Sequence, residues 1–309
     1  MQNFRIVIFI IIALFAGCER RAVDPPTVPL RQVADDLGRT VVVPVDVKRA
    51  VSLAPSVTES IFAIGAEDRL VGVTSFCDYP EAAKSIAKVG DTMTPNLETI
   101  VALKPDVVFV STASQIEAFT RTLGDNGIAV FVMSPNNLQD VYRNLNQLGI
   151  IFDNAASVFH IVQGLQRREV SVRSAVHSVL STGDPIFSEG WHRPSVFVQI
   201  SREPLFTIGK ESFITRTIQD AGGRSVTADV ATAYPKLSKE TAAVLNPEVI
   251  ILSDSEDNRD PNEVFRSSPA VKHGRVYRIN ADILSRPGPR LVDALEQIAR
   301  VLHPKVFSE

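Results

Sequence analysis

The chain has 309 residues, of which 22% are charged, and its formal net charge at pH 7 is −3. Basic and acidic residues are interspersed and form no basic stripe that would fit a phosphate backbone, so nucleic acid is excluded as a partner. The length is sufficient for two lobes with separate hydrophobic cores.

The N-terminal residues predict export from the cytoplasm. A short basic start is followed by an apolar run of ten residues, Ile6 to Phe15, and then by Ala16-Gly17-Cys18. Such a run is too short to cross a bilayer, which requires roughly 20 residues in a helix, so residues 1–17 are predicted to be a secretory signal peptide. The cysteine resembles that of a bacterial lipobox, which implies lipidation of Cys18 and a proline-rich tether over residues 18–32.

The N-terminal lobe is predicted to cover residues 33–152. It begins with a hairpin that turns at Gly38, and a helix follows that starts in a capping box formed by Ser56 and Glu59 and ends at Gly65. Strands that alternate with helices predict a parallel sheet. The predicted strands are residues 40–43, 50–53, 70–73, 107–110 and 128–133.

One short unit occurs twice along the chain. Residues 98–110 read Glu-Thr-Ile-Val-Ala-Leu-Lys-Pro-Asp-Val-Val-Phe-Val, and residues 240–252 read Glu-Thr-Ala-Ala-Val-Leu-Asn-Pro-Glu-Val-Ile-Ile-Leu. In each copy a helical run stops before a proline, and a β-branched run short enough for a buried strand follows. Two distant copies predict paired α/β lobes and not a solenoid. A cleft between two lobes is a common site for a small ligand.

A long helix is predicted between the lobes, over residues 153–182. Valine, leucine and isoleucine recur there at helical spacing, with Arg167, Arg168, Glu169 and Arg173 on the remaining face. At 1.5 Å per residue the helix would be roughly 42 Å long, enough to join the lobes as a strut. The alternative is two shorter helices with a break near Glu169.

The C-terminal lobe is predicted to cover residues 183–309, with strands at 196–200, 249–252 and 276–279 and a last helix over 289–302. The predicted fold class is therefore α/β, with two Rossmann-like lobes that contain parallel sheets and are joined by one long inter-lobe helix.

Six motifs occur in the order typical of one receptor family. They are Val51 to Glu59, Asp78 to Pro80, Asn96 to Glu98, Leu103 to Asp106, Phe206 to Ser212 and Arg286 to Arg290. Over residues 33–302 the chain resembles the helical-backbone (class III) substrate-binding proteins of ABC importers, which bind cobalamin, haem or ferric siderophores, and among them most of all the cobalamin (vitamin B12) receptors. The resemblance implies a monomeric, lipid-anchored receptor on the periplasmic or outer face of a bacterial membrane. Its partners would be a small ligand and a permease with its ATPase.

The resemblance also implies a ligand site in the cleft. A corrin ring is a broad apolar disc edged with amides, so aromatic faces and a few polar groups would suit a corrinoid, the implied cargo. Thr92 and Ser111 stand where the cobalamin receptors have tryptophans, which leaves room for another corrinoid or a bulkier chelate. The implied ligand-binding residues are Phe76, Tyr79, Phe206, Tyr234, Asp282, Ile283, Leu284, Ser285 and Arg286.

Other functions are possible alternatives. A receptor for an anionic iron chelate would need converging arginines, for which Arg202 and Arg286 are candidates, although Asp282 would repel such a ligand. The five histidines are scattered and predict no metal site. An enzyme is not expected, because the sequence lacks a nucleophile elbow, a His-Glu-x-x-His helix and a complete phosphate loop at residues 209–212. A scaffold lipoprotein without cargo would leave the two lobes unexplained.

Three further residues carry specific expectations. Cys77 is expected to be a buried packing residue, with a thiolate ligand to cobalt as the alternative. Glu98 and Glu240 open equivalent helices, one in each lobe, where the helix dipole favours a carboxylate. The resemblance implies that both glutamates dock against arginines of the permease.

Overall fold

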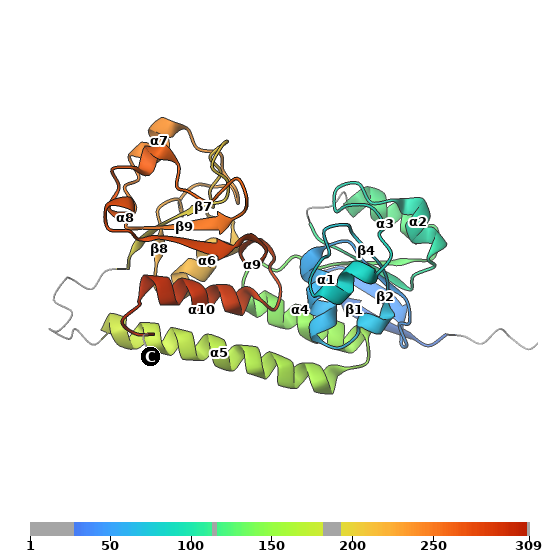
Figure 1. The fold of residues 1–309 in the computed structure, drawn as a ribbon. Helices are drawn as coiled ribbons and strands as arrows, with labels where there is room; N and C mark the ends of the chain where they lie inside the picture. Colours follow the sequence, from blue (N-terminus) through green and yellow to red (C-terminus); the bar gives the residue numbers. More distant parts are fainter. Residues whose placement is uncertain (1–27, 113–115, 182–192, 308–309) are drawn as a thin grey trace, which may run out of the picture.

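The computed structural model describes residues 28–112, 116–181 and 193–307. It contains two lobes, each with a parallel sheet of four strands, and the long helix α5 (Ala155–Ser181) runs beneath both of them (Figure 1). The predicted α/β fold with two parallel-sheet lobes and one long connecting helix is confirmed. The predicted signal peptide, residues 1–17, and the lipidation site Cys18 lie outside the described residues.

The N-terminal lobe combines a parallel sheet in the order β4-β3-β5-β6 with a separate antiparallel hairpin, β1-β2. Gly38 has a φ of +74° at the hairpin turn, a conformation that glycine adopts without strain. Leu30, which falls inside the predicted tether of residues 18–32, already pairs with Pro44, so the folded body begins earlier than predicted. The elements are β1 (Leu30–Ala34), β2 (Thr40–Pro44), β3 (Ala50–Ser52), α1 (Pro55–Ala63), η1 (Glu67–Arg69), β4 (Leu70–Val73), η2 (Glu81–Ser85), α2 (Leu97–Ala102), β5 (Val107–Val110), α3 (Ile116–Gly124), β6 (Ala129–Val132) and α4 (Leu138–Ile151).

The C-terminal lobe has a parallel sheet in the order β10-β9-β7-β8. Its edge strand β8 has two residues and was not predicted, because so short a strand leaves no alternating pattern. The elements are β7 (Ser195–Gln199), α6 (Phe213–Asp220), β8 (Arg224–Ser225), α7 (Lys239–Ala243), β9 (Val249–Asp254), η4 (Glu263–Phe265), α8 (Pro269–Lys272), β10 (Val276–Asn280), α9 (Ala281–Ser285) and α10 (Leu291–Leu302).

The two copies of the repeated unit fold alike. In each, a short helix (α2 or α7) leads into an interior strand of its sheet (β5 or β9). The residues before the two prolines, Lys104 and Asn246, have φ values of +46° and +44°, respectively. A positive φ is uncommon for residues other than glycine, so its presence at both positions supports the equivalence of the two units.

The beginning of α1 differs from the prediction. The helix starts at Pro55, the N-cap residue Ala54 makes no side-chain cap hydrogen bond, and Ser56 lies inside the helix. Proline suits the first helical position because its missing N–H would have no partner there, so no capping box is needed. Gly65 follows the helix with a φ of +71°, in agreement with the predicted end.

The connecting helix α5 is continuous over 27 residues, or about 40 Å at 1.5 Å per residue, which excludes a break near Glu169. Glu169, which was predicted to lie on the face without the apolar residues, is buried. Its buried carboxylate accepts hydrogen bonds from Gln139 Nε2 and from the Tyr142 hydroxyl of α4, and it pairs with Arg173. Neither α5 nor any other helix of the described residues is long and apolar enough to cross a membrane.

One hydrophobic cluster runs through both lobes by way of α5. It contains Phe109 of the N-terminal sheet, Val162 and Val176 of α5, and Leu295 of α10. Arg168 of α5 also forms ion pairs with Asp293 and Glu296 of α10, which reinforce the contact between α5 and the C-terminal lobe. Because packed cores resist deformation, the shared cluster holds the two lobes in a fixed relation.

Candidate ligand-binding site

An open cavity of about 480 Å³ lies between the two lobes. Its N-terminal wall is formed by loops that follow the carboxyl ends of β3, β5 and β6, which is where ligands bind in open parallel sheets. Most lining side chains are short hydroxyl or apolar groups. The lining residues are Ala54, Pro55, Ser56, Phe76, Thr92, Ser111, Thr112, Met133, Ser134, Pro135, Asn136, Glu211, Ser212, Phe213, Ala233, Tyr234, Asp282, Ser285, Arg286 and Pro287.

Five of the residues implied by the family resemblance meet in this cavity: Phe76, Tyr234, Asp282, Ser285 and Arg286. Phe76 and Tyr234 come from different lobes, and 57% and 43% of their surfaces are exposed. Both side chains are exposed and line the cavity, so both are available for a ligand. Partial burial raises the pKa of the Tyr234 phenol, against a smaller opposing effect of Ser212, and keeps the phenol neutral.

The other four implied residues do not line the cavity. In α9, Asp282 lies one helical turn from Ser285 and Arg286, whereas the intervening Ile283 and Leu284 pack into the core. The resemblance implied every residue from Asp282 to Arg286. In a helix, however, residues three or four apart share one face, so this segment is divided between the cavity and the core.

The aromatic residues Tyr79 and Phe206 also lie elsewhere. The ring of Tyr79 is covered by the guanidinium of Arg290, with the Cζ atom 3.9 Å from the ring centroid. Phe206 is half-buried and makes backbone bridges to Ser201 and Lys236. Tyr79 and Phe206 therefore contact other parts of the protein and do not line the cavity.

Several lining residues were missed in the sequence, among them the four residues of the loop from Met133 to Asn136. This loop follows β6 directly, so the carboxyl-end rule would have found it. Within the cavity wall the Thr112 and Ser134 hydroxyls lie 2.7 Å apart and share a hydrogen bond. Thr92 and Ser111 do line the cavity, as the resemblance implied.

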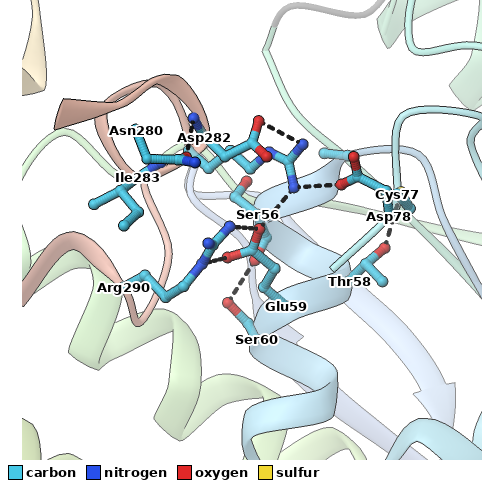
Figure 2. A network of polar contacts seen from close by, with 12 residues as sticks. Ser56, Thr58, Glu59, Ser60, Cys77, Asp78, Asn280, Asp282, Ile283 and Arg290 are labelled. Carbon is cyan, nitrogen blue, oxygen red and sulfur yellow. Dashed lines mark hydrogen bonds and ion pairs between the residues drawn. The ribbon is translucent and has the colours of Figure 1, made fainter. Parts of the chain in front are cut away.

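A network of charged side chains joins the lobes beside the cavity (Figure 2). Arg286 pairs with Glu59 of α1 at 3.0 Å, with Asp78 at 2.8 Å and with Asp282 at 2.8 Å. Arg290 donates two further hydrogen bonds to the Glu59 carboxylate, at 2.6 and 2.8 Å. Because Glu59 and Asp78 belong to the N-terminal lobe and the other three residues to the C-terminal lobe, the network acts as an inter-lobe clasp.

Asp78 and Arg286 of this clasp stay charged at neutral pH. Burial tends to raise the pKa of Asp78, but hydrogen bonding and charge from Arg286 outweigh it, so the pKa lies below its ordinary value. The carboxylates likewise hold the pKa of Arg286 above its ordinary value, despite the opposing effect of burial. Arg286 is thus an engaged ion-pair partner, not an arginine held open for an anion.

The remaining candidates occupy structural positions. Arg202 does not line the cavity, and its backbone carbonyl accepts a hydrogen bond from Asn262. Cys77 is 1% exposed, with its Sγ 3.2 Å from the Thr58 hydroxyl and 3.1 Å from the Thr74 hydroxyl. The expectation of a buried packing residue is confirmed. Within the described residues, no group of three or more His, Cys, Asp or Glu side chains could hold a metal ion.

Glu98 and Glu240 are exposed in the first turns of α2 and α7. The N-cap positions of both helices are filled by other side chains, since Asn96 accepts from the Thr99 N–H and Ser238 accepts from the Thr241 N–H. Backbone hydrogen bonding and the Ser238 hydroxyl lower the pKa of Glu240. Neither glutamate is needed to cap its helix, and the carboxylate of Glu240 is charged at neutral pH.

Two lobes around an open cavity define a receptor for a small ligand. The family model of the periplasmic binding proteins matches residues 51–283, and the chain belongs to this family. Proteins of this family bind ligands without catalysis, so the chain is a receptor and not an enzyme.

Known relatives agree with this assignment. The uncharacterized ABC transporter substrate-binding lipoprotein YvrC of Bacillus subtilis is 29% identical over 283 residues, which cover 90% of this chain and 87% of the relative. The crystal structure of the periplasmic vitamin B12 binding protein BtuF of Vibrio cholerae has a TM-score of 0.72 and 26% identity, and covers 86% of this chain and 100% of that one. A periplasmic haem-binding protein from Pseudomonas aeruginosa has a TM-score of 0.72 and 22% identity, covering 84% and 93%, and shares the fold.

The chain is therefore an extracytoplasmic substrate-binding protein of an ABC transporter. Such a protein has a small-molecule ligand and a permease as its partners.

Proposed function

We propose that this receptor captures a corrinoid, cobalamin or one of its precursors, in the inter-lobe cavity and delivers it to the permease. The observation that carries the proposal is the pair of exposed aromatics, Phe76 and Tyr234, on opposite walls of one cavity. Aromatic faces stack on a broad, largely apolar ring. The hydroxyl and amide groups of Thr112, Ser134 and Asn136 are suited to the amides at the edge of a corrin.

Anchoring by a lipid on Cys18 completes the proposed function. The apolar run and the Ala16-Gly17 pair that precede Cys18 support it, and so does the lipoprotein relative in Bacillus subtilis. Acyl chains on this residue would keep the receptor near its permease, since several chains anchor more stably than one. Glu98 and Glu240 would set the orientation of docking.

The proposed cargo is tested by titration calorimetry of the purified protein with cyanocobalamin, cobinamide, haemin and a ferric hydroxamate. A corrinoid is expected to bind most tightly, because its ring matches the aromatic walls of the cavity. Binding of haemin or the hydroxamate without either corrinoid would reject the proposal and favour a haem or siderophore receptor. Binding of none of the four would favour a different cargo or a scaffold.

Truncation of Tyr234 tests the stacking surface. Tyr234→Ala is expected to weaken corrinoid binding by about 1 to 3 kcal/mol, the typical loss for a large buried aromatic contact. Phe159→Ala is the matched control, because Phe159 is a comparably exposed aromatic on α5, outside the cavity lining. The affinity of each variant is measured by calorimetry. Wild-type affinity in Tyr234→Ala would place this residue outside the site.

A further inference from the structure

Arg286 lines the cavity, yet its positive charge is fully occupied. Its side chain is only 11% exposed and contacts carboxylates of Glu59, Asp78 and Asp282. An arginine that recognises an anionic ligand presents its guanidinium fork to that ligand. Here the fork is taken by side chains from both lobes before any ligand arrives.

The clasp as a whole is negative. Three carboxylates face two guanidinium groups, those of Arg286 and Arg290, which leaves one net negative charge beside the cavity. Glu211 adds a second negative charge to the lining. Among the described residues that line the cavity, Arg286 is the one cation.

An adjoining hollow does not reverse this balance. It shares Asn136, Glu211 and Ser212 with the cavity, and it presents Lys210 and Arg216. Glu211 and Asp229 line the same hollow and match these two positive charges. A ligand that extends from the cavity into the hollow therefore meets no surplus of positive charge in the described residues.

We propose that Glu59, Asp78 and Asp282 determine ligand specificity by neutralising Arg286, so that the cavity rejects anionic chelates and admits ligands without net negative charge. The proposal rests on the proposed function, whose neutral, amide-edged cargo fits such a site. Specificity of this kind arises from repulsion of the wrong ligand as much as from attraction of the right one.

The decisive experiment removes carboxylate charge and measures binding of a ferric tris-catecholate, which carries three negative charges. Near a protein surface the effective dielectric constant is about 20, so the removal of each carboxylate charge should measurably reduce the electrostatic repulsion of this chelate. Asp78→Asn/Asp282→Asn is expected to bind the chelate at least about tenfold more tightly than wild type at low ionic strength. Asp78→Asn alone should show a smaller gain, and high salt should reduce both gains.

The control is Asp46→Asn/Asp125→Asn, which changes the net charge equally at exposed positions outside the clasp. An equal gain in the control, or no gain in either clasp variant, would overturn the proposal. Cyanocobalamin, which has no net charge, should gain no affinity in the clasp variants. Failure of wild type to bind cyanocobalamin would reject the corrinoid cargo but not the charge effect, which the chelate reports separately.

Discussion

Replacement of Glu98 and Glu240 by arginine is expected to abolish uptake of the ligand in cells that carry the cognate permease. The two carboxylates are exposed, one on each lobe, at equivalent positions of a repeated helix-strand unit. Held at fixed positions by a common core, two such charges can set the registry of docking on a permease, and charge reversal turns attraction into repulsion. Uptake of labelled cyanocobalamin measures the effect.

This prediction has a sharp control. Ligand affinity and the thermal midpoint of the double variant should stay near wild type, because neither glutamate lines the cavity or caps its helix. Glu67→Arg/Glu256→Arg reverses one exposed glutamate in each lobe outside α2 and α7 and should leave uptake intact. Normal uptake by the Glu98/Glu240 variant would leave these residues without a docking role.

Glu59→Gln is expected to lower the free energy of unfolding by about 3 kcal/mol. Removal of one partner of a buried ion pair leaves an uncompensated charge, which typically costs about 3 to 5 kcal/mol. The Glu59 side chain is 2% exposed and receives hydrogen bonds from both arginines, whereas Arg286 keeps two other carboxylates and Arg290 keeps the Tyr79 ring. The lower end of the range is therefore expected, measured by urea denaturation.

Asp46→Asn provides the comparison, because Asp46 pairs with Arg69 and Lys48 at an exposed position. Exposed pairs contribute little to stability, so its denaturation midpoint should remain close to wild type. If Glu59→Gln unfolds at the same urea concentration as Asp46→Asn, the clasp does not stabilise the folded protein.

Much of the architecture was predictable because it depends on local patterns. The repeated unit predicted the paired α/β lobes, and the helical spacing of apolar residues predicted α5 to within a residue or two. The start of α1 was harder to predict from the sequence, since Ser56 fits a capping box as well as it fits the interior of a helix that begins with proline. Glu59, the other residue of the predicted capping box, is bound instead by Arg286 and Arg290, which are more than 200 residues away in the sequence.

Buried charges were the main failure of prediction. Glu59 and Glu169 look like ordinary polar positions of amphipathic helices, yet both are buried among partners from other elements. The same limit applies to the site, where Phe76 and Tyr79 differ by three positions but only Phe76 lines the cavity. Which face of a loop meets the cleft is decided by tertiary packing, for which a single sequence carries no direct signal.

The shared core along α5 has a consequence for ligand exchange. Lobes that seldom move apart on their own spend little free energy on closing around a ligand, so contact energy is retained as a long residence time. Spontaneous escape would then be slow compared with transport. The permease would then assist unloading by moving the lobes, which would strain both the Glu59 clasp and the α5 interface.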